Sequence, residues 1–300
     1  MNNFIVRTIT GLLFVAAVIV CFLNAVSMMA FFALVTGLTL WEFTGLVNDR
    51  EKVKVNRFIS TAAGVYLFIA VGVYCNGATP ASVFIPYLLT IVYLFISELY
   101  MRNEDAVNDW AYTMMSQLYI ALPLSCINML AMREMTVVTE GGLSGTGQVA
   151  YCMLLPLSIF VFLWINDTGA YITGSLLGRH KLFPRVSPGK SWEGSIGGGI
   201  FVLLISQLIA YIDHENLIES MNIASSAPTG LTNIEWMGLG LTVVFFGTWG
   251  DLVESLFKRT LGIKDSGTIL PGHGGMLDRF DSSLMAIPAA VVYLYTVSLV

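Results

Sequence analysis

The residues with the most informative spacing lie near the end of an apolar segment that is long enough to cross a membrane. Asp251, Glu254, Ser255 and Lys258 are spaced i, i+3, i+4 and i+7, so they share one face of a helix. A charged side chain at membrane depth costs on the order of 2.5 to 3.5 kcal/mol on insertion scales, and it usually faces a polar cavity. We therefore expect this face to line a functional site. The alternative is a ladder of Asp/Lys and Glu/Lys pairs that snorkels at the membrane interface.

The segment after this helix adds three carboxylates, Asp265, Asp278 and Asp281, together with Lys264 and Arg279. Carboxylate oxygens without thiolate or imidazole ligands suit Mg²⁺ better than Zn²⁺. Magnesium held by carboxylates and by a substrate triphosphate is the usual arrangement for phosphoryl-type transfer, in which metal and cations stabilise charge on the leaving group. We therefore predict magnesium-assisted transfer chemistry, and a second cation beside the Mg²⁺ is an open alternative.

The same segment contains a glycine-rich turn. Gly272, Gly274 and Gly275 would let backbone N–H groups turn inward as a cradle for an anion. His273 lies between them, where it either contacts phosphate or acts as a general base. Asp281 or Ser282, by contrast, could simply cap the following helix.

The composition places these residues in a membrane protein. Of 300 residues, 56% are apolar and 12% are charged, and the mean hydropathy is +0.74. Soluble domains have roughly 45 to 50% apolar and about 25% charged residues, so this excess of apolar surface belongs in lipid. The four cysteines show no metal-ligand spacing, and we interpret them as small hydrophobic residues.

The predicted fold is all-α and polytopic, with about nine membrane-spanning helices, since spanning the hydrocarbon takes about 20 apolar residues. The first window lacks a following polar domain, so we interpret it as an uncleaved helix and not as a signal peptide. The nine windows are Phe4–Asn24, Val26–Val47, Phe58–Cys75, Ala81–Tyr100, Trp110–Met132, Gln148–Leu177, Gly194–Ile212, Trp236–Lys258 and Ser282–Val300.

The distribution of basic residues predicts the orientation. With a cytoplasmic N-terminus, every Lys and Arg except Arg133 falls on the inside, as the positive-inside rule requires. Recognisable motifs begin only beyond Asn166. We therefore expect residues 1–145 to form a helical scaffold of five helices, and residues 146–300 to form the catalytic membrane region, with four helices and cytoplasmic loops.

Two further segments fit a polar site. Asp167 follows Asn166 inside an apolar run longer than one span requires, which predicts a broken helix facing a cavity. The alternative is a kink stabilised by side-chain bonds to the backbone. The loop from Ser187 to Gly194 carries Lys190, and it imitates the end of a P-loop, but Pro184 replaces the first glycine and no strand precedes it.

The chain resembles a known family in its signature. The matching residues are Ser255-x-x-Lys258-Arg259, Lys264-Asp265 and Pro271-x-His273-Gly274-Gly275-x-x-Asp278-Arg279-x-Asp281. This run is similar to the signature of the phosphatidate cytidylyltransferase (CDP-diglyceride synthase) family. Ser187-Pro188-Gly189-Lys190-Ser191-x-Glu193 resembles the family's Ser-Pro-Lys-Lys-Thr-x-Glu motif, and it departs from that motif at Gly189 and Ser191.

The resemblance implies transfer of CMP from CTP to phosphatidate, giving CDP-diacylglycerol and pyrophosphate. It implies an active site at the cytoplasmic face of the bacterial inner membrane, Mg²⁺ as the cofactor and a homodimer. The expected partners are CTP, phosphatidate and the bilayer, with no nucleic acid.

We assign the expected roles as follows. Mg²⁺ ligands are Asp251 and Asp278, with Asp167, Glu254 and Asp281 as further or supporting carboxylates. The catalytic set is Asp251, Asp278, Lys258, Lys264 and Arg279. Nucleotide and phosphate contacts are Ser187, Lys190, Glu193, Ser255, Asp265, His273, Gly274 and Gly275.

Two other functions compete with this prediction. An ion-coupled transporter would use the intramembrane Asp167, Asp251 and Glu254 to bind a cation, but the chain has no inverted repeat and its charges gather at one membrane face. An integral-membrane enzyme that activates or phosphorylates another lipid would use similar chemistry.

Overall fold

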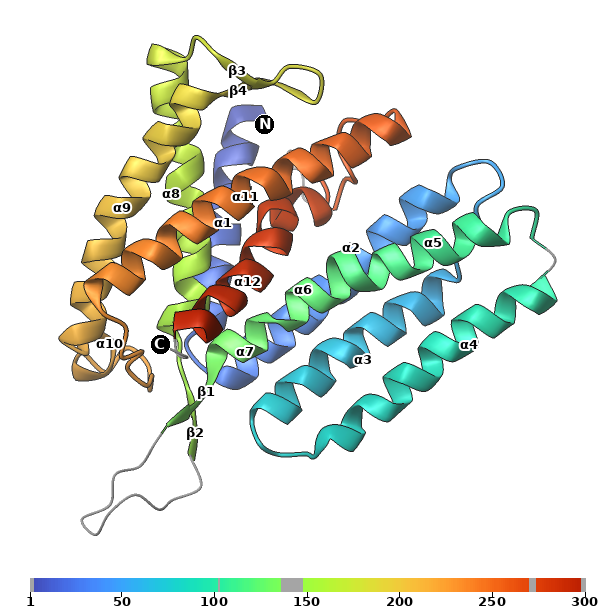
Figure 1. Ribbon diagram of the computed structural model, residues 1–300, viewed down its shortest axis with the longest axis horizontal. Coiled ribbons are helices and arrows are strands. Elements are labelled where there is room, and N and C mark those ends of the chain that lie inside the picture. The colour runs from blue at the N-terminus through green and yellow to red at the C-terminus, as the bar shows by residue number, and fades with distance from the viewer. Residues whose placement is uncertain (1–2, 102, 136–147, 270–273, 298–300) are drawn as a thin grey trace. The chain divides into compact units, whose positions relative to one another are not determined.

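The structure, a computed structural model, describes residues 3–101, 103–135, 148–269 and 274–297 (Figure 1). Within these residues it consists of helices and two short two-stranded sheets, which confirms an all-α polytopic membrane protein. Eight helices of the described chain are long and apolar enough to cross a membrane. The first predicted window forms α1 (Asn3–Cys21), whose apolar part, Thr8–Cys21, is shorter.

The chain divides into two compact units. The C-terminal unit comprises Met1–Val18, Leu157–Leu217 and Gly230–Val300. The N-terminal unit comprises Ile19–Pro156 and Ile218–Thr229. Most of α1 therefore belongs with the helices that carry the predicted site residues.

In the N-terminal unit, α3 packs against α2, α4 and the run from α5 to α7. The helix widens by one residue at η2, where Leu122 N donates a hydrogen bond to Gln117 O. This wider turn comes directly before Pro123, which lacks an N–H and whose ring crowds the preceding turn. The elements are α2 (Ala25–Asn48), α3 (Arg57–Cys75), η1 (Ala81–Phe84), α4 (Ile85–Met101), α5 (Ala106–Ser116), η2 (Gln117–Ala121), α6 (Leu122–Ser125), α7 (Ile127–Ala131), β1 (Met132–Met135) and β2 (Gln148–Tyr151).

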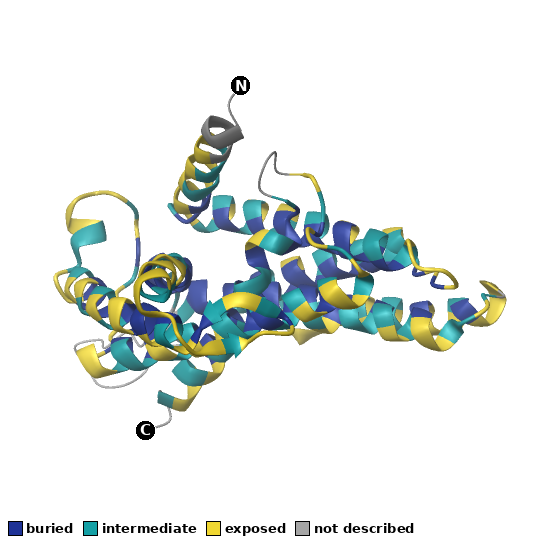
Figure 2. Cartoon of the chain, turned by 90° about the horizontal axis from the view of Figure 1, so that it is seen from above, coloured by how far each residue is buried: buried dark blue, intermediate teal, exposed yellow. Residues whose placement is uncertain are grey.

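In the C-terminal unit, α11 packs against both α9 and α12 (Figure 1). A capping box of Thr232 and Glu235 begins α11, and Gly262, at φ 73°, ends it in a left-handed conformation. The elements are α8 (Leu154–Leu177), β3 (Lys181–Phe183), β4 (Ser187–Ser191), α9 (Trp192–His214), α11 (Asn233–Leu261) and α12 (Leu277–Val297). The short α10 (Leu217–Ser220) follows α9 in sequence, and all of it but Leu217 belongs to the N-terminal unit. The long helices carry buried and exposed residues side by side, as Figure 2 shows.

The predicted break in the helix around Asp167 is wrong, because α8 is continuous from Leu154 to Leu177. The apolar run looked too long for one span because its first residues form β2 and not part of the helix. A helix satisfies its backbone hydrogen bonds internally, so α8 needs no break at its polar residues, and α9 approaches them closely because it has a glycine there. A Cβ at Gly198 would lie 2.7 Å from Asn166 O, so the two backbones approach closely.

The last helix begins earlier than predicted, at Leu277 and not at Ser282. Asp278, Arg279 and Asp281 therefore lie in its first turns and not in a loop, and neither Asp281 nor Ser282 caps it. Asp278 stabilises the start of this helix, since Oδ2 accepts a hydrogen bond from Gly275 N at 2.8 Å, close to the positive end of the helix dipole.

Candidate functional site

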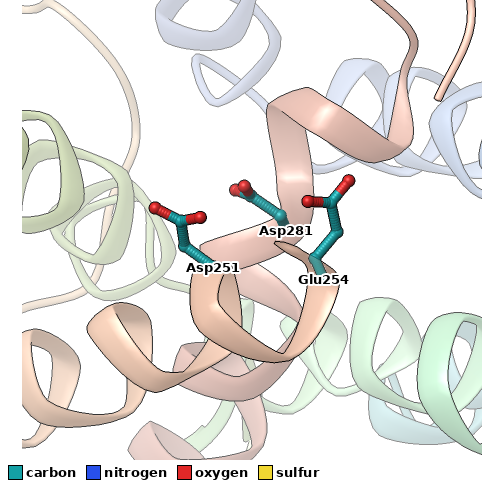
Figure 3. Close-up of side chains that lie close together, drawn as sticks. All are labelled: Asp251, Glu254 and Asp281. Atoms are coloured by element: carbon teal, nitrogen blue, oxygen red, sulfur yellow. The ribbon is translucent and has the colours of Figure 1, made fainter. Parts of the chain in front are cut away.

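Three carboxylates from two helices converge in the C-terminal unit. Asp251 and Glu254 come from α11 and Asp281 from α12, and one oxygen of each lies within 4.8 Å of the others (Figure 3). Glu254 is fully buried, and its Oε1 has no hydrogen-bond partner among the described residues. Three ionised carboxylates at this separation repel one another, so a cation bound between them would stabilise their ionised forms. The oxygen-only donor set suits a hard cation such as Mg²⁺.

The close approach of α12 to α11 depends on Gly250. A Cβ on this residue would lie 2.9 Å from Asp281 O and 3.0 Å from Ser282 O, which is too close for any side chain. No role was predicted for Gly250 from the sequence. The signal was available, because a glycine inside a spanning helix commonly permits close helix packing.

Lys258 joins the cluster to the start of α12. Its Nζ lies 2.7 Å from Glu254 Oε2 and 2.7 Å from Asp278 Oδ1. Asp278 Oδ2 accepts hydrogen bonds from the backbone N–H groups of Ser266, at 2.9 Å, and Gly275, at 2.8 Å. Both Asp278 oxygens are therefore engaged in holding the preceding loop to α11, beside the three clustered carboxylates.

A second lysine reaches the cluster from the β3–β4 hairpin. Lys190 Nζ lies 2.5 Å from Asp251 Oδ2, and it donates to Thr248 O at 3.5 Å. The other Asp251 oxygen, Oδ1, accepts a hydrogen bond from Ser255 Oγ at 3.1 Å. Two separate segments thus fix the orientation of the Asp251 carboxylate, as outer partners do for metal-binding carboxylates.

Two cavities meet at Asp167. The acidic pocket, of about 370 Å³, is lined by Asp167, Asp251, Asp278, Arg279 and Asp281 and by apolar residues of α1 and α8. The lysine pocket, of about 400 Å³, contains Lys190 and extends between α8, β4 and α9 to Thr248. Asp167 lines both, so the structure places it with the predicted site although α8 is unbroken.

The hairpin motif is positioned by Glu193. Its carboxylate accepts hydrogen bonds from the backbone N–H groups of Arg179 and His180, each at 3.1 Å, and contacts His180 Nδ1 at 2.5 Å. Ser191 caps α9 through a hydrogen bond from Gly194 N at 3.2 Å. Neither Ser187 nor Glu193 lines the acidic or the lysine pocket. Their predicted contacts with phosphate stay predictions.

The remaining predicted residues lie in the loop between α11 and α12. Lys264 and Asp265 are exposed and line neither pocket. Gly274 has a left-handed φ of 82°. The Gly275 N–H, which was predicted to bind a substrate anion, donates instead to the Asp278 carboxylate. His273, with Pro271 and Gly272, lies outside the described residues.

Comparison with known proteins gives a consistent family. The sequence model of the cytidylyltransferase family matches residues 5–297. The chain is 31% identical to a phosphatidate cytidylyltransferase of Haemophilus influenzae over 268 residues, which is 86% of this chain and 88% of the relative. Phosphatidate cytidylyltransferases of Staphylococcus aureus (strain COL) and Staphylococcus haemolyticus are 46% and 47% identical over 134 residues, 44% of this chain and 45% of each relative.

Proposed function

The chain belongs to the cytidylyltransferase family, and from this membership we propose that it transfers CMP from CTP to phosphatidate, giving CDP-diacylglycerol and pyrophosphate. The names of the bacterial relatives support these substrates. The observation that carries the proposal is the contact of Asp251 with Lys190 beside Glu254 and Asp281, which puts acidic and basic groups in adjoining cavities.

Asp251, Glu254 and Asp281 are the residues that would hold Mg²⁺. Glu254 Oε2 pairs with Lys258, but the buried Oε1 has no partner among the described residues, which supports this assignment because a buried carboxylate oxygen without a donor or cation is costly. When bound, the metal neutralises charge on the triphosphate of CTP. Asp167 stays proposed as a supporting carboxylate. Asp278 was predicted as a metal ligand, and we now propose it as a supporting carboxylate, because Lys258 and two backbone N–H groups engage both of its oxygens.

The phosphate oxygen of phosphatidate is ionised near neutral pH, so its attack on the α-phosphorus of CTP requires little help from a general base. The new bond joins this oxygen to the α-phosphorus, and the bond from the α-phosphorus to the bridging oxygen breaks, so that pyrophosphate leaves. Lys190 and Arg279, which line the two pockets, would bring the phosphates together and compensate the developing negative charge.

The proposed setting is the inner membrane of a bacterium, with nine spans, a cytoplasmic N-terminus and the site facing the cytoplasm. The concentration of Lys and Arg on one side of the predicted topology supports this orientation. A homodimer, which the family resemblance implies, is part of the same proposal.

The decisive experiment incubates the purified protein with CTP labelled in its cytidine, Mg²⁺ and phosphatidate. We expect label in the lipid phase, and we expect chelation of the metal to abolish it. Asp251→Asn should lower the rate by at least about 10²-fold, because it weakens both the metal site and the contact with Lys190. Asp49→Asn, at an exposed position of the N-terminal unit to which no role is assigned, is the matched control. Absence of lipid-soluble label with the wild-type protein would refute the proposal.

A further inference from the structure

An apolar groove runs between α9 and α11 in the C-terminal unit. It encloses about 520 Å³, within the usual range of ligand sites, and it is lined by six residues of α9 from Trp192 to Leu203 and by five of α11 from Leu241 to Trp249. These two helices lie side by side in Figure 1. Apart from Ser195 and Thr248, the lining side chains are apolar or absent, so the groove suits a hydrocarbon ligand.

The groove has the length and direction of a lipid chain in one leaflet. From Trp192 to Leu203 a helix rises roughly 16 Å, which is about half of the roughly 30 Å thickness of the hydrocarbon core. Trp192 is the first residue of α9, next to the β3–β4 hairpin. The groove therefore starts at the level of Lys190 and follows the helices into the span.

The polar end of the groove adjoins the lysine pocket. Ser195 and Thr248 line both cavities, and Lys190 Nζ donates to Thr248 O at 3.5 Å. The lysine pocket in turn shares Asp167 with the acidic pocket. A single molecule with an anionic head and an apolar tail would therefore place its head at Lys190, in the lysine pocket, and its tail in the adjoining groove.

The floor of the groove is hollowed by a glycine. A Cβ on Gly199 would meet only Val244 Cγ1, at 3.8 Å, so the space above Gly199 is open. Around it, the side chains of Ile196, Ile200 and Phe245 are 62%, 55% and 57% exposed and would face lipid. Because bulk lipid is as apolar as these side chains, the groove would contribute position and packing more than affinity.

We propose that this groove holds one acyl chain of the phosphatidate substrate while the phosphate of the same molecule lies at Lys190. The inference rests on the proposed function and names the part of the site that selects the lipid chain. The chain fixes the depth and direction from which the phosphate enters the lysine pocket. The groove is thus a specificity-determining element for chain length.

The test fills the groove by Gly199→Phe, since Gly199 lines the groove and a Cβ there would meet no atom closer than Val244 Cγ1, at 3.8 Å. Rates with dioleoyl-phosphatidate and dihexanoyl-phosphatidate are compared for the purified protein in detergent. We expect the ratio of kcat/KM for the long-chain over the short-chain substrate to fall about tenfold, because a displaced chain misplaces the reacting phosphate. Gly199→Ala, which adds one methyl group, should lower this ratio less.

The matched control is Leu208→Phe, which adds a similar ring at a position of α9 that is 54% exposed and outside the groove. It should keep the wild-type ratio. A wild-type ratio in Gly199→Phe would overturn the inference. If Gly199→Phe kept the wild-type ratio but changed the oligomeric state, the inference would also be overturned, and the occupant of the groove would be a second copy of the chain.

A binding experiment separates this inference from the proposed function. A phosphatidate with a diazirine in its acyl chain should label the segments 192–203 and 241–249, and unlabelled phosphatidate should compete. Equal labelling by the corresponding phosphatidylcholine would overturn the inference, because the groove would then hold bulk lipid. If the wild-type protein produced no CDP-diacylglycerol, the proposed function would fail, and the labelling would still decide whether the groove takes a phosphatidate chain.

Discussion

Lys190 Nζ lies 2.5 Å from Asp251 Oδ2, which joins the β3–β4 hairpin to the acidic cluster of α11. The lysine is partly exposed and lines the lysine pocket, so it can exchange Asp251 for a phosphate when substrate enters. Whether Asp251 is paired with Lys190 therefore depends on whether a phosphate occupies the lysine pocket.

Replacing this lysine tests that coupling. We expect Lys190→Met to lower kcat/KM about 10²- to 10³-fold, the usual effect of removing one group that stabilises developing charge. Lys190→Arg should retain part of the activity, because it keeps the charge but not the compact ammonium group. Steady-state rates with CTP and phosphatidate measure both effects. Lys181→Met, on exposed β3, is the control, and wild-type rates in Lys190→Met would contradict the assignment.

Asp281 and Asp278 are close in sequence, but they lie in different environments. Asp281 belongs to the three clustered carboxylates. Asp281→Asn should therefore raise the Mg²⁺ concentration required for half-maximal activity at least about tenfold, as the loss of a carboxylate from a metal site weakens its hold on the ion. The midpoint of thermal unfolding without metal should not fall, because the substitution removes one of three repelling charges.

Asp278→Asn should show the opposite pattern. Asp278 pairs with Lys258 at 2.7 Å and accepts two backbone hydrogen bonds, so its loss leaves a partly buried lysine with Glu254 as its remaining partner. We expect a cost of about 2 to 4 kcal/mol in stability, measured as a lower midpoint of thermal unfolding in detergent. Equal metal defects in the two variants, without a difference in stability, would restore Asp278 as a metal ligand.

The hydroxyl of Ser255 orients Asp251 through its 3.1 Å hydrogen bond to Oδ1. Ser255→Ala should weaken metal binding about 10- to 100-fold, the effect expected for an outer partner of a ligand, and should leave the fold intact. Titration with Mn²⁺ monitored by electron paramagnetic resonance measures the affinity directly. Thr260→Ala removes from the same helix a hydroxyl whose hydrogen bond goes to Leu256 O, and this variant should bind Mn²⁺ as the wild type does.

The sequence predicted the part of the site that follows from helix periodicity. Asp251, Glu254, Ser255 and Lys258 lie on one helix, where spacing alone determines which side chains share a face. The pairing of Lys190 with Asp251 depends on how a hairpin packs against a distant helix, and no local pattern encodes that packing. The sequence could therefore predict Lys190 as a phosphate contact without revealing its partner.

Two errors have physical causes. The predicted break at Asp167 assumed that polar residues in an apolar run interrupt a helix. In the structure α8 is continuous, because a helix satisfies its own backbone groups, and it packs closely against Gly198 of α9. The late start predicted for α12 followed hydropathy, which excludes charged residues from a span. In the structure, Asp278 and Asp281 lie inside the helix. Lys258 of α11 pairs with Asp278, and Asp281 lies beside the carboxylates of α11.

Gly250 offers a test of the site that changes no charged group. A methyl group there would lie 2.9 Å from Asp281 O and 3.0 Å from Ser282 O, and these backbone atoms cannot move without moving α12. We expect Gly250→Ala to cost about 1 to 3 kcal/mol in stability through overpacking. Because it shifts Asp281 away from Asp251 and Glu254, it should also lower kcat by about 10²-fold, as displacements near 1 Å do.

The two effects can be separated by comparison with Gly197→Ala, in which the added methyl group meets the side chain of Thr173 and not a backbone. Gly197→Ala should lower the midpoint of thermal unfolding without changing the requirement for Mg²⁺, because Gly197 lies on α9, which supplies none of the three clustered carboxylates. Gly250→Ala should change both. If Gly250→Ala lost stability but kept the wild-type Mg²⁺ requirement, the convergence of α11 and α12 would not be what assembles the metal site.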